Sequence, residues 1–174
     1  MIRCCVKSDF ETIHEIINDA AQAYRGIIPP DRWHEPYMGT DELSNEIGDG
    51  VVFWGAQREG RLAAVMGIQN RGEVTLIRHA YVRTRLQGQG IGTALLRRLE
   101  EMTDKPILIG TWAVATWAVS FYQKNEYALV TRREKDLLLK RYWRIPDRQV
   151  ETSVVLADAA GMRDLSAGRL APPV

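Results

Sequence analysis

The first 50 residues have the hydrophobic spacing of helices joined by a loop. Apolar side chains recur every three or four positions over residues 10–24, and Ser8 and Glu11 have the spacing of a capping box at the start of that helix. A second short helix is predicted over residues 40–48. Prolines and aromatic residues fill positions 25–40, so we expect a loop there that is long enough to bind a ligand.

The spacing becomes that of strands from residue 51 on. Three runs of apolar, β-branched or aromatic residues occupy positions 51–56, 62–68 and 74–82, with a tight turn between each pair. This pattern predicts an antiparallel meander. A further short apolar run, residues 2–6, is expected to form a strand at the start of the chain.

Helices and strands alternate in the next part of the chain. Amphipathic helices are predicted over residues 91–102 and 116–124, and short apolar strands at 107–112 and 128–131. A strand that returns through a helix to the next strand implies parallel pairing at the centre of the sheet. The sequence therefore predicts an α/β (α+β) fold with a mixed sheet.

The C-terminal part of the chain has weaker patterns. A charged amphipathic segment covers residues 133–146, and an alternating strand, 150–156, is expected at an edge of the sheet. Residues 158–174 lack a clear pattern and are interpreted as a tail. We therefore expect one domain, residues 1–157, followed by this tail.

Composition narrows the class of protein. The chain has 174 residues, 45% of them apolar and 26% charged, which is typical of one globular domain and excludes a disordered or fibrous chain. No apolar run reaches the roughly 18 residues of a membrane span, and the N-terminus lacks the apolar core of a signal peptide. The expected location is the cytoplasm.

Charge and metal-binding residues exclude two further classes. The net charge is +1 without a long basic run, so nucleic acid is not expected as a partner. Cys4 and Cys5 are neighbours and are expected to stay reduced, and His14, His34 and His79 are scattered singly. No metal site is expected, because no ligand spacing recurs.

A glycine-rich segment between a predicted strand and a predicted helix carries the clearest chemical signal. Its sequence is Gln87-Gly88-Gln89-Gly90-Ile91-Gly92-Thr93. Glycines allow close approach of a ligand, and the first N–H groups of the helix would point at an anion. The phosphate loop of nucleotide triphosphatases does not fit, because no lysine follows these glycines. The dinucleotide fingerprint does not fit either, because Thr93 stands at the position of its last glycine.

Two motifs resemble those of the GNAT acyltransferases. Gln87-x-x-Gly90-x-Gly92 is similar to the pyrophosphate-binding signature of that family, and Phe121-Tyr122-x-Lys124 is similar to a second family motif. The resemblance implies a mostly antiparallel sheet of about seven strands with a splay between the fourth and fifth. It also implies acetyl-CoA as co-substrate and no metal.

The resemblance assigns roles to individual residues. Tyr122 matches the tyrosine that protonates the departing thiolate in many members. The backbone of Val82, Arg83 and Thr84 matches the segment that pairs with the pantetheine arm. The pyrophosphate segment corresponds to Gln87, Gly88, Gln89, Gly90, Ile91, Gly92, Thr93, Ala94 and Leu95. Ala115 departs from the family's usual asparagine, and Glu126 departs from its usual glycine.

Direct attack of an amine on the thioester requires a base but no covalent intermediate on the protein. His79 is one candidate base, and its alternation with Arg78 predicts that only one of the two side chains faces the cleft. Glu35 and His34, in the aromatic loop, are the alternatives. Arg83 and Arg85 are candidates for binding the 3′-phosphate of the coenzyme.

Acceptor contacts are expected from two segments, residues 24–37 and 133–143. Their aromatic residues, Trp33, Tyr37, Tyr142 and Trp143, suggest either an aromatic acceptor pocket or the packing of two loops on each other.

Two functions remain open at this point. The first is an acetyl-CoA-dependent N-acetyltransferase acting on an amine of a small molecule or peptide. The second is an acyl-CoA-binding regulatory module without turnover. No membrane or nucleic acid partner is expected, and the resemblance implies a homodimer formed by edge strands.

Overall fold

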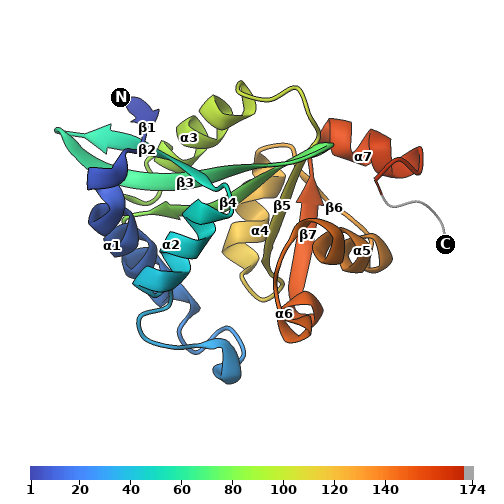
Figure 1. Cartoon of the computed structure of the whole chain (residues 1–174), viewed down its shortest axis with the longest axis horizontal. Coiled ribbons are helices and arrows are strands. Elements are labelled where there is room, and N and C mark those ends of the chain that lie inside the picture. The colour runs from blue at the N-terminus through green and yellow to red at the C-terminus, as the bar shows by residue number, and fades with distance from the viewer. Residues whose placement is uncertain (171–174) are drawn as a thin grey trace. The chain divides into compact units, whose positions relative to one another are not determined.

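The computed structural model describes residues 1–170, which form two compact units (Figure 1). The first unit contains residues 1–70 and 77–104, and the second contains residues 71–76 and the chain from residue 105 on. The boundary between the units therefore falls within one strand, β4. Each unit has a hydrophobic core cluster of its own.

The first unit contains the antiparallel meander and three helices. Its strands are β1 (Ile2–Cys4), β2 (Val52–Arg58), β3 (Arg61–Arg71) and most of β4 (Val74–Val82). Its helices are α1 (Phe10–Ala21), α2 (Thr40–Gly48) and α3 (Ile91–Glu100), with short 3₁₀ turns at Lys7–Asp9, Gln22–Tyr24, Pro30–Arg32 and Thr84–Leu86. In the antiparallel pairs, Ile2 lies opposite Ala56 and Val52 lies opposite Ile68.

The alternation of side chains along β2 separates two faces of the first unit. Phe53 packs into a cluster with Ile16 of α1 and Leu43 of α2, whereas the neighbouring Trp54 lies under the guanidinium of Arg98 on α3. Because successive strand residues point to opposite faces, α1 and α2 cover one face of the meander and α3 covers the other (Figure 1).

The second unit is built on three antiparallel strands. They are β5 (Ile107–Trp112), β7 (Ser153–Ala157) and β6 (Ala128–Leu129), in that spatial order. Its helices are α4 (Thr116–Lys124), α5 (Arg132–Tyr142), α6 (Asp147–Thr152) and α7 (Ala159–Ser166). The prediction of an edge position for the last strand is wrong: β7 lies between β5 and β6, and Val155, Leu156 and Ala157 are fully buried there.

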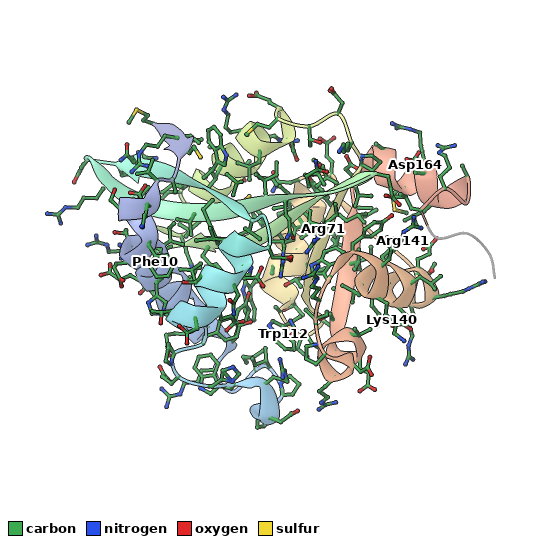
Figure 2. The ribbon with its side chains drawn as sticks, in the orientation of Figure 1. Phe10, Arg71, Trp112, Lys140, Arg141 and Asp164 are labelled. Carbon is green, nitrogen blue, oxygen red and sulfur yellow. The ribbon has the colours of Figure 1, made fainter. Side chains whose placement is uncertain are left out.

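Helix α5 is the predicted charged amphipathic segment. Thr131 and Glu134 form a capping box at its start. At its other end, the Tyr142 hydroxyl donates to the Glu73 carboxylate over 2.6 Å. Arg141, which is labelled in Figure 2, pairs with the same carboxylate. Burial and the Glu73 hydrogen bond both raise the pKa of Tyr142, so its phenol stays protonated.

The strands follow the order β1-β2-β3-β4-β5-β7-β6, and β5 runs parallel to β4. Within the second unit, the Thr75 N–H at the start of β4 donates to the Pro106 carbonyl over 2.9 Å. The predicted fold, a mixed and mostly antiparallel sheet of seven strands flanked by helices, is therefore confirmed.

Two details near the chain ends differ from the expectation. The Ser8–Glu11 capping box is absent; the Asp9 carboxylate accepts from the Val6 N–H instead and binds Arg3 through two hydrogen bonds. The segment interpreted as a tail contains α7, whose N-terminus is capped by Asp158. The domain boundary at residue 157 stays a prediction, and positions 171–174 of the expected tail lie outside the described residues.

None of the helices described between residues 1 and 170 combines the length and the apolar character needed to span a bilayer.

Candidate active site

The glycine-rich loop leads from β4 into α3 in the first unit. Gly88 and Gly90 both have a φ of 75°, a left-handed backbone that favours glycine. A Cβ atom built at either residue would have no atom within 4 Å, so the space above the loop is open. Gln87, Gly88, Gln89 and Gly90 are all exposed, as a ligand-binding loop requires.

The first turn of α3 offers backbone N–H groups to that open space. Gly90 is the N-cap and has no side chain to cap the helix, and the first intrahelical bond runs from the Ala94 N–H to the Gly90 carbonyl over 3.0 Å. The N–H groups of Ile91, Gly92 and Thr93 therefore have no helical carbonyl to bind. Such groups, at the positive end of a helix dipole, fit the diphosphate of a coenzyme.

Buried side chains hold this helix start in place. Ile91 and Leu95 are 5% and 0% exposed, so their side chains belong to the core of the first unit. What these two residues present at the loop is their backbone. The sequence-predicted pyrophosphate segment thus combines exposed glycine-rich backbone with a buried anchor.

The end of β4 uses much of its hydrogen-bonding capacity within the protein. The Arg83 N–H donates to the Ala63 carbonyl of β3 over 2.9 Å, and the Thr84 N–H donates to the Asp19 carboxylate over 2.7 Å. Because backbone groups alternate along a strand, the N–H of Val82 points to the edge of β4 that does not face β3. Val82 is thus the one of these three residues whose amide faces away from the meander.

The two arginines considered for the coenzyme phosphate line a polar pocket of about 490 Å³. Arg83 is held there by Glu15, at 3.3 Å, and by the Leu62 carbonyl. Arg85 is exposed and has no ion pair among residues 1–170. Of these two arginines, Arg83 is therefore already paired with an acid and Arg85 is not.

His79 and Arg78 reach the same carboxylate, that of Glu46 on α2. His79 Nε2 lies 3.1 Å from Glu46 Oε2, and Arg78 Nη1 lies 2.7 Å from the same oxygen. The alternation expected of these two neighbours is absent, because both side chains reach Glu46, and which of them faces the cleft stays a prediction. His79 has a φ of 51°, and this left-handed residue breaks the alternation of the strand.

Charge and packing hold this group rigidly. Burial by itself would raise the pKa of Glu46, but the hydrogen bond and charge of His79 and the guanidinium of Arg78 outweigh it and lower the pKa. Arg78 also binds the side chain of the buried Gln69. The ring of His79 stacks on Phe53 at 5.9 Å. Glu46 is therefore a fixed anion that holds the imidazole at Nε2.

Glu46 is the member of this group that the sequence did not indicate. Helix α2 contains several acidic residues, and nothing in their spacing distinguishes Glu46 from Glu42. Only the packing of α2 on β4 selects it. Glu46 differs from the other acidic residues of α2 in being half-buried, but the exposure of a side chain cannot be read from one sequence.

The other candidate bases lie in the exposed loop between α1 and α2. Glu35 accepts a hydrogen bond from Gln22 over 2.9 Å, and His34 is exposed. The same loop contributes to a cluster of rings: Tyr24 lies 5.3 Å from Tyr37, and Trp33 stacks on Tyr37 at 5.9 Å.

The candidate acid, Tyr122, belongs to α4 in the second unit. It is 7% exposed, and its ring makes edge contacts with Phe121 at 5.1 Å and Tyr127 at 6.2 Å. Tyr142 and Trp143 are also buried in this unit, within the cluster that contains Leu138. Tyr142 and Trp143 are therefore part of the hydrophobic core. Of the four aromatic residues proposed as acceptor contacts, only Trp33 and Tyr37 are half-buried and partly accessible to solvent.

No group of histidine, cysteine and acidic side chains among residues 1–170 has the arrangement of a metal site.

Comparison with known families identifies the domain. The profile of the acetyltransferase (GNAT) domain matches residues 12–136. The chain belongs to the GNAT family of acetyltransferases. The resemblance inferred from the sequence is thereby confirmed, and with it the class of reaction, acetyl transfer from acetyl-CoA. No curated protein sequence matches the chain.

Several solved GNAT structures are similar in fold. PaiA N-acetyltransferase from Thermoplasma acidophilum, in complex with coenzyme A, has 19% identity and a TM-score of 0.69, over 91% of this chain and 97% of that one. A GNAT-family acetyltransferase from Staphylococcus aureus Mu50 has 16% identity and a TM-score of 0.68, over 91% and 97%. The ribosomal-protein-S18-alanine N-acetyltransferase from Escherichia coli has 18% identity and a TM-score of 0.65, over 93% and 94%.

This GNAT domain has two local departures from the motif pattern. Ala115 is fully buried and its N–H donates to the Trp112 carbonyl over 3.0 Å, so it offers no polar side chain to a ligand. Glu126 has a φ of 71°, in the left-handed region where a glycine would be unstrained. The second departure concerns only the turn after α4.

Proposed function

We propose that this GNAT enzyme transfers the acetyl group of acetyl-CoA to a primary amine of a small molecule or a peptide. The amine attacks the thioester directly, in a complex that holds both substrates. The observation that carries the proposal is the contact of His79 with Glu46, a pair that we assign as the proton acceptor for the amine. One structurally similar enzyme acts on the alanine of a ribosomal protein, which supports an amine as the acceptor class.

A base is needed because an alkyl amine is mostly protonated at neutral pH. In the neutral tautomer of His79 that donates from Nε2 to the Glu46 carboxylate, the lone pair is on Nδ1. His79 Nδ1 has no other bonding partner in the part of the chain that the structure describes. We infer that Nδ1 takes the proton of the amine, so that the new N–C bond forms from a neutral nitrogen.

The coenzyme supplies the activated thioester carbonyl. The N–H groups of Ile91, Gly92 and Thr93 would bind its diphosphate, with Gln87 to Leu95 as the surrounding segment. The Val82 N–H would stabilise the negative charge that develops on the carbonyl oxygen. As the C–S bond breaks, Tyr122 would give its proton to the thiolate, and the amine's proton restores it through solvent.

The acceptor is proposed to bind against the ring cluster of Tyr24, Trp33 and Tyr37. Burial raises the pKa of Tyr24 despite a hydrogen bond with Tyr81, so its ring stays a neutral phenol. Neutral aromatic faces attract ammonium groups, which matches an amine that arrives protonated. Glu35, at the rim of the same loop, is the alternative base and would act on an ammonium through water.

The experiment measures free thiol release from acetyl-CoA over a panel of primary amines, amino acids and N-terminal peptides, beside calorimetry with the coenzyme. We expect turnover with at least one amine and loss of coenzyme binding in Gly90→Val, which cannot adopt the loop backbone without strain. Tight coenzyme binding without turnover on any amine would instead support a regulatory module. Absence of coenzyme binding would overturn both.

A further inference from the structure

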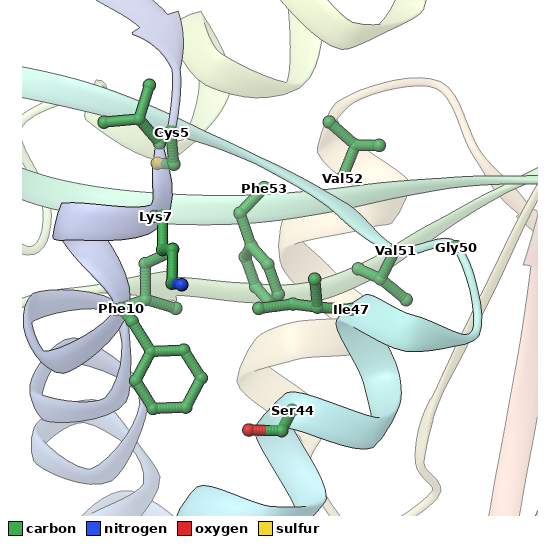
Figure 3. A pocket seen from close by; sticks show the side chains of 11 residues that line it. Cys5, Lys7, Phe10, Ser44, Ile47, Gly50, Val51, Val52 and Phe53 are labelled. Carbon is green, nitrogen blue, oxygen red and sulfur yellow. The ribbon is translucent and has the colours of Figure 1, made fainter.

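A second pocket lies in the first unit, on the face of the meander that α1 and α2 cover. It has a volume of about 750 Å³ and lies between the 3₁₀ turn before α1, the end of α2 and the start of β2 (Figure 3). That volume is in the range of small-molecule sites, which are typically 300–1,000 Å³. None of the residues assigned above to the coenzyme, the acceptor or the base lines it.

The pocket has apolar walls. Phe10 and Ile13 come from α1, Ile47 from the end of α2, and Val51 and Phe53 from β2 and the residue before it (Figure 3). All five side chains are hydrocarbon. Such a pocket binds most tightly a ligand whose apolar surface it removes from water, because burial of apolar surface lowers the free energy of binding.

Exposed apolar side chains extend the pocket to the surface. Val6 is 59% exposed, Val52 is 47% exposed and Ile47 is 41% exposed, and all three line the pocket. Contiguous exposed apolar side chains around a hollow are typical of a ligand or partner site. The pocket is thus accessible from solvent.

Lys7 is the single charged residue among those that line the pocket. Its side chain points into the pocket in Figure 3, and its ammonium has no hydrogen bond or ion pair within residues 1–170. Ser44 and Cys5 also line the pocket, with a hydroxyl and a thiol. Burial raises the pKa of Cys5 to about 12, so this thiol is neutral and does not offset the charge of Lys7.

We propose that this pocket binds a carboxylate with an aliphatic tail, its tail against Phe10, Ile47 and Phe53 and its head beside Lys7. The apolar walls select the tail, and the unpaired ammonium selects an anionic head over a neutral or cationic one. The site is distinct from acetyl transfer, although Phe53 also stacks on His79.

The test uses sodium octanoate and observes the methyl signals of Ile13, Ile47, Val51 and Val52 by NMR, without acetyl-CoA or amine. Octanoate should shift these signals with saturation at millimolar concentration or below. Butanoate should bind much more weakly, because each methylene is worth roughly a fourfold change in affinity. 1-Octanol, with the same tail and no charge, should bind more weakly than octanoate.

Two variants with matched controls locate the site. Lys7→Gln should weaken octanoate binding by about fivefold and leave octanol binding unchanged, whereas Lys140→Gln on α5 should change neither (Figure 2). Ser44→Trp should fill the pocket and abolish binding, while Asn45→Trp, at the next exposed position of α2, should not.

Three results would overturn the proposal. They are unchanged methyl signals with octanoate, equal binding of octanoate and octanol, and full octanoate affinity in Lys7→Gln. Each is a binding measurement, so it is independent of whether the enzyme acetylates any amine.

Discussion

Glu46 and His79 meet at 3.1 Å although 33 positions separate them in the chain. The contact joins the last turns of α2 to a left-handed residue within β4. This residue turns the imidazole to the side of the sheet where Arg78 also binds Glu46. The regular alternation of side chains along β4 is therefore interrupted at His79, the proposed base.

His79→Asn should lower kcat for acetyl transfer by roughly a hundredfold, because the proton acceptor is removed. Asparagine tolerates the left-handed backbone at this position, so the fold should persist. Glu46→Gln should lower kcat by about tenfold, since it removes the anion that holds the ring. Glu42→Gln, on the same helix, is the control, and initial rates of thiol release measure all three. Equal rates in His79→Asn and the wild type would show that His79 is not the base, and Glu35 would then be the candidate.

Tyr122→Phe should reduce kcat by about a hundredfold and leave the affinity for the coenzyme nearly unchanged. The substitution keeps the buried ring and its contacts with Phe121 and Tyr127, and it removes only the proton donor. Tyr127→Phe, a buried neighbour on the same cluster, is the matched control. Steady-state kinetics with calorimetry separate the two parameters, and an unchanged kcat in Tyr122→Phe would remove this residue from the mechanism.

Glu126→Gly should stabilise the protein by about 1 kcal/mol. The residue has a φ of 71°, which costs a side-chain-bearing residue free energy and costs glycine none. Gln123→Gly, three positions earlier and inside α4, should destabilise the protein by about 1 kcal/mol, because its backbone is helical. Urea unfolding compares the two, and destabilisation by Glu126→Gly would show that its side-chain contacts outweigh the backbone strain.

Asp9→Asn should destabilise the protein by about 1 kcal/mol at pH 7. The hydrogen bonds of Arg3 hold the pKa of Asp9 at about 2, below its ordinary value of 3.8. Because the pKa is lower in the folded state, this stabilisation is present above about pH 4 and is lost as the pH falls toward 2. Urea unfolding at several pH values should show wild type and variant converging at the acid end. A constant difference across that range would contradict the assignment.

Local patterns were sufficient for most of the elements and for the family. The strand at Ile107–Trp112 and the helix at Thr116–Lys124 have the bounds that the sequence predicts. Their order, together with the glycines of the loop, was enough to indicate the family that the domain profile confirms. Periodicity and glycine placement are short-range properties, so they are legible in the sequence.

Packing decided what the sequence left open or predicted wrongly. The sequence by itself determined most of the helices and strands, because neighbouring residues set those properties, but it missed α6 and α7. Only the tertiary structure placed β7 inside its sheet, broke the alternation at His79 and chose Glu46 among the acids of α2. These features depend on contacts between residues far apart in the chain, and such contacts stabilise the structure only once the helices and strands have packed together.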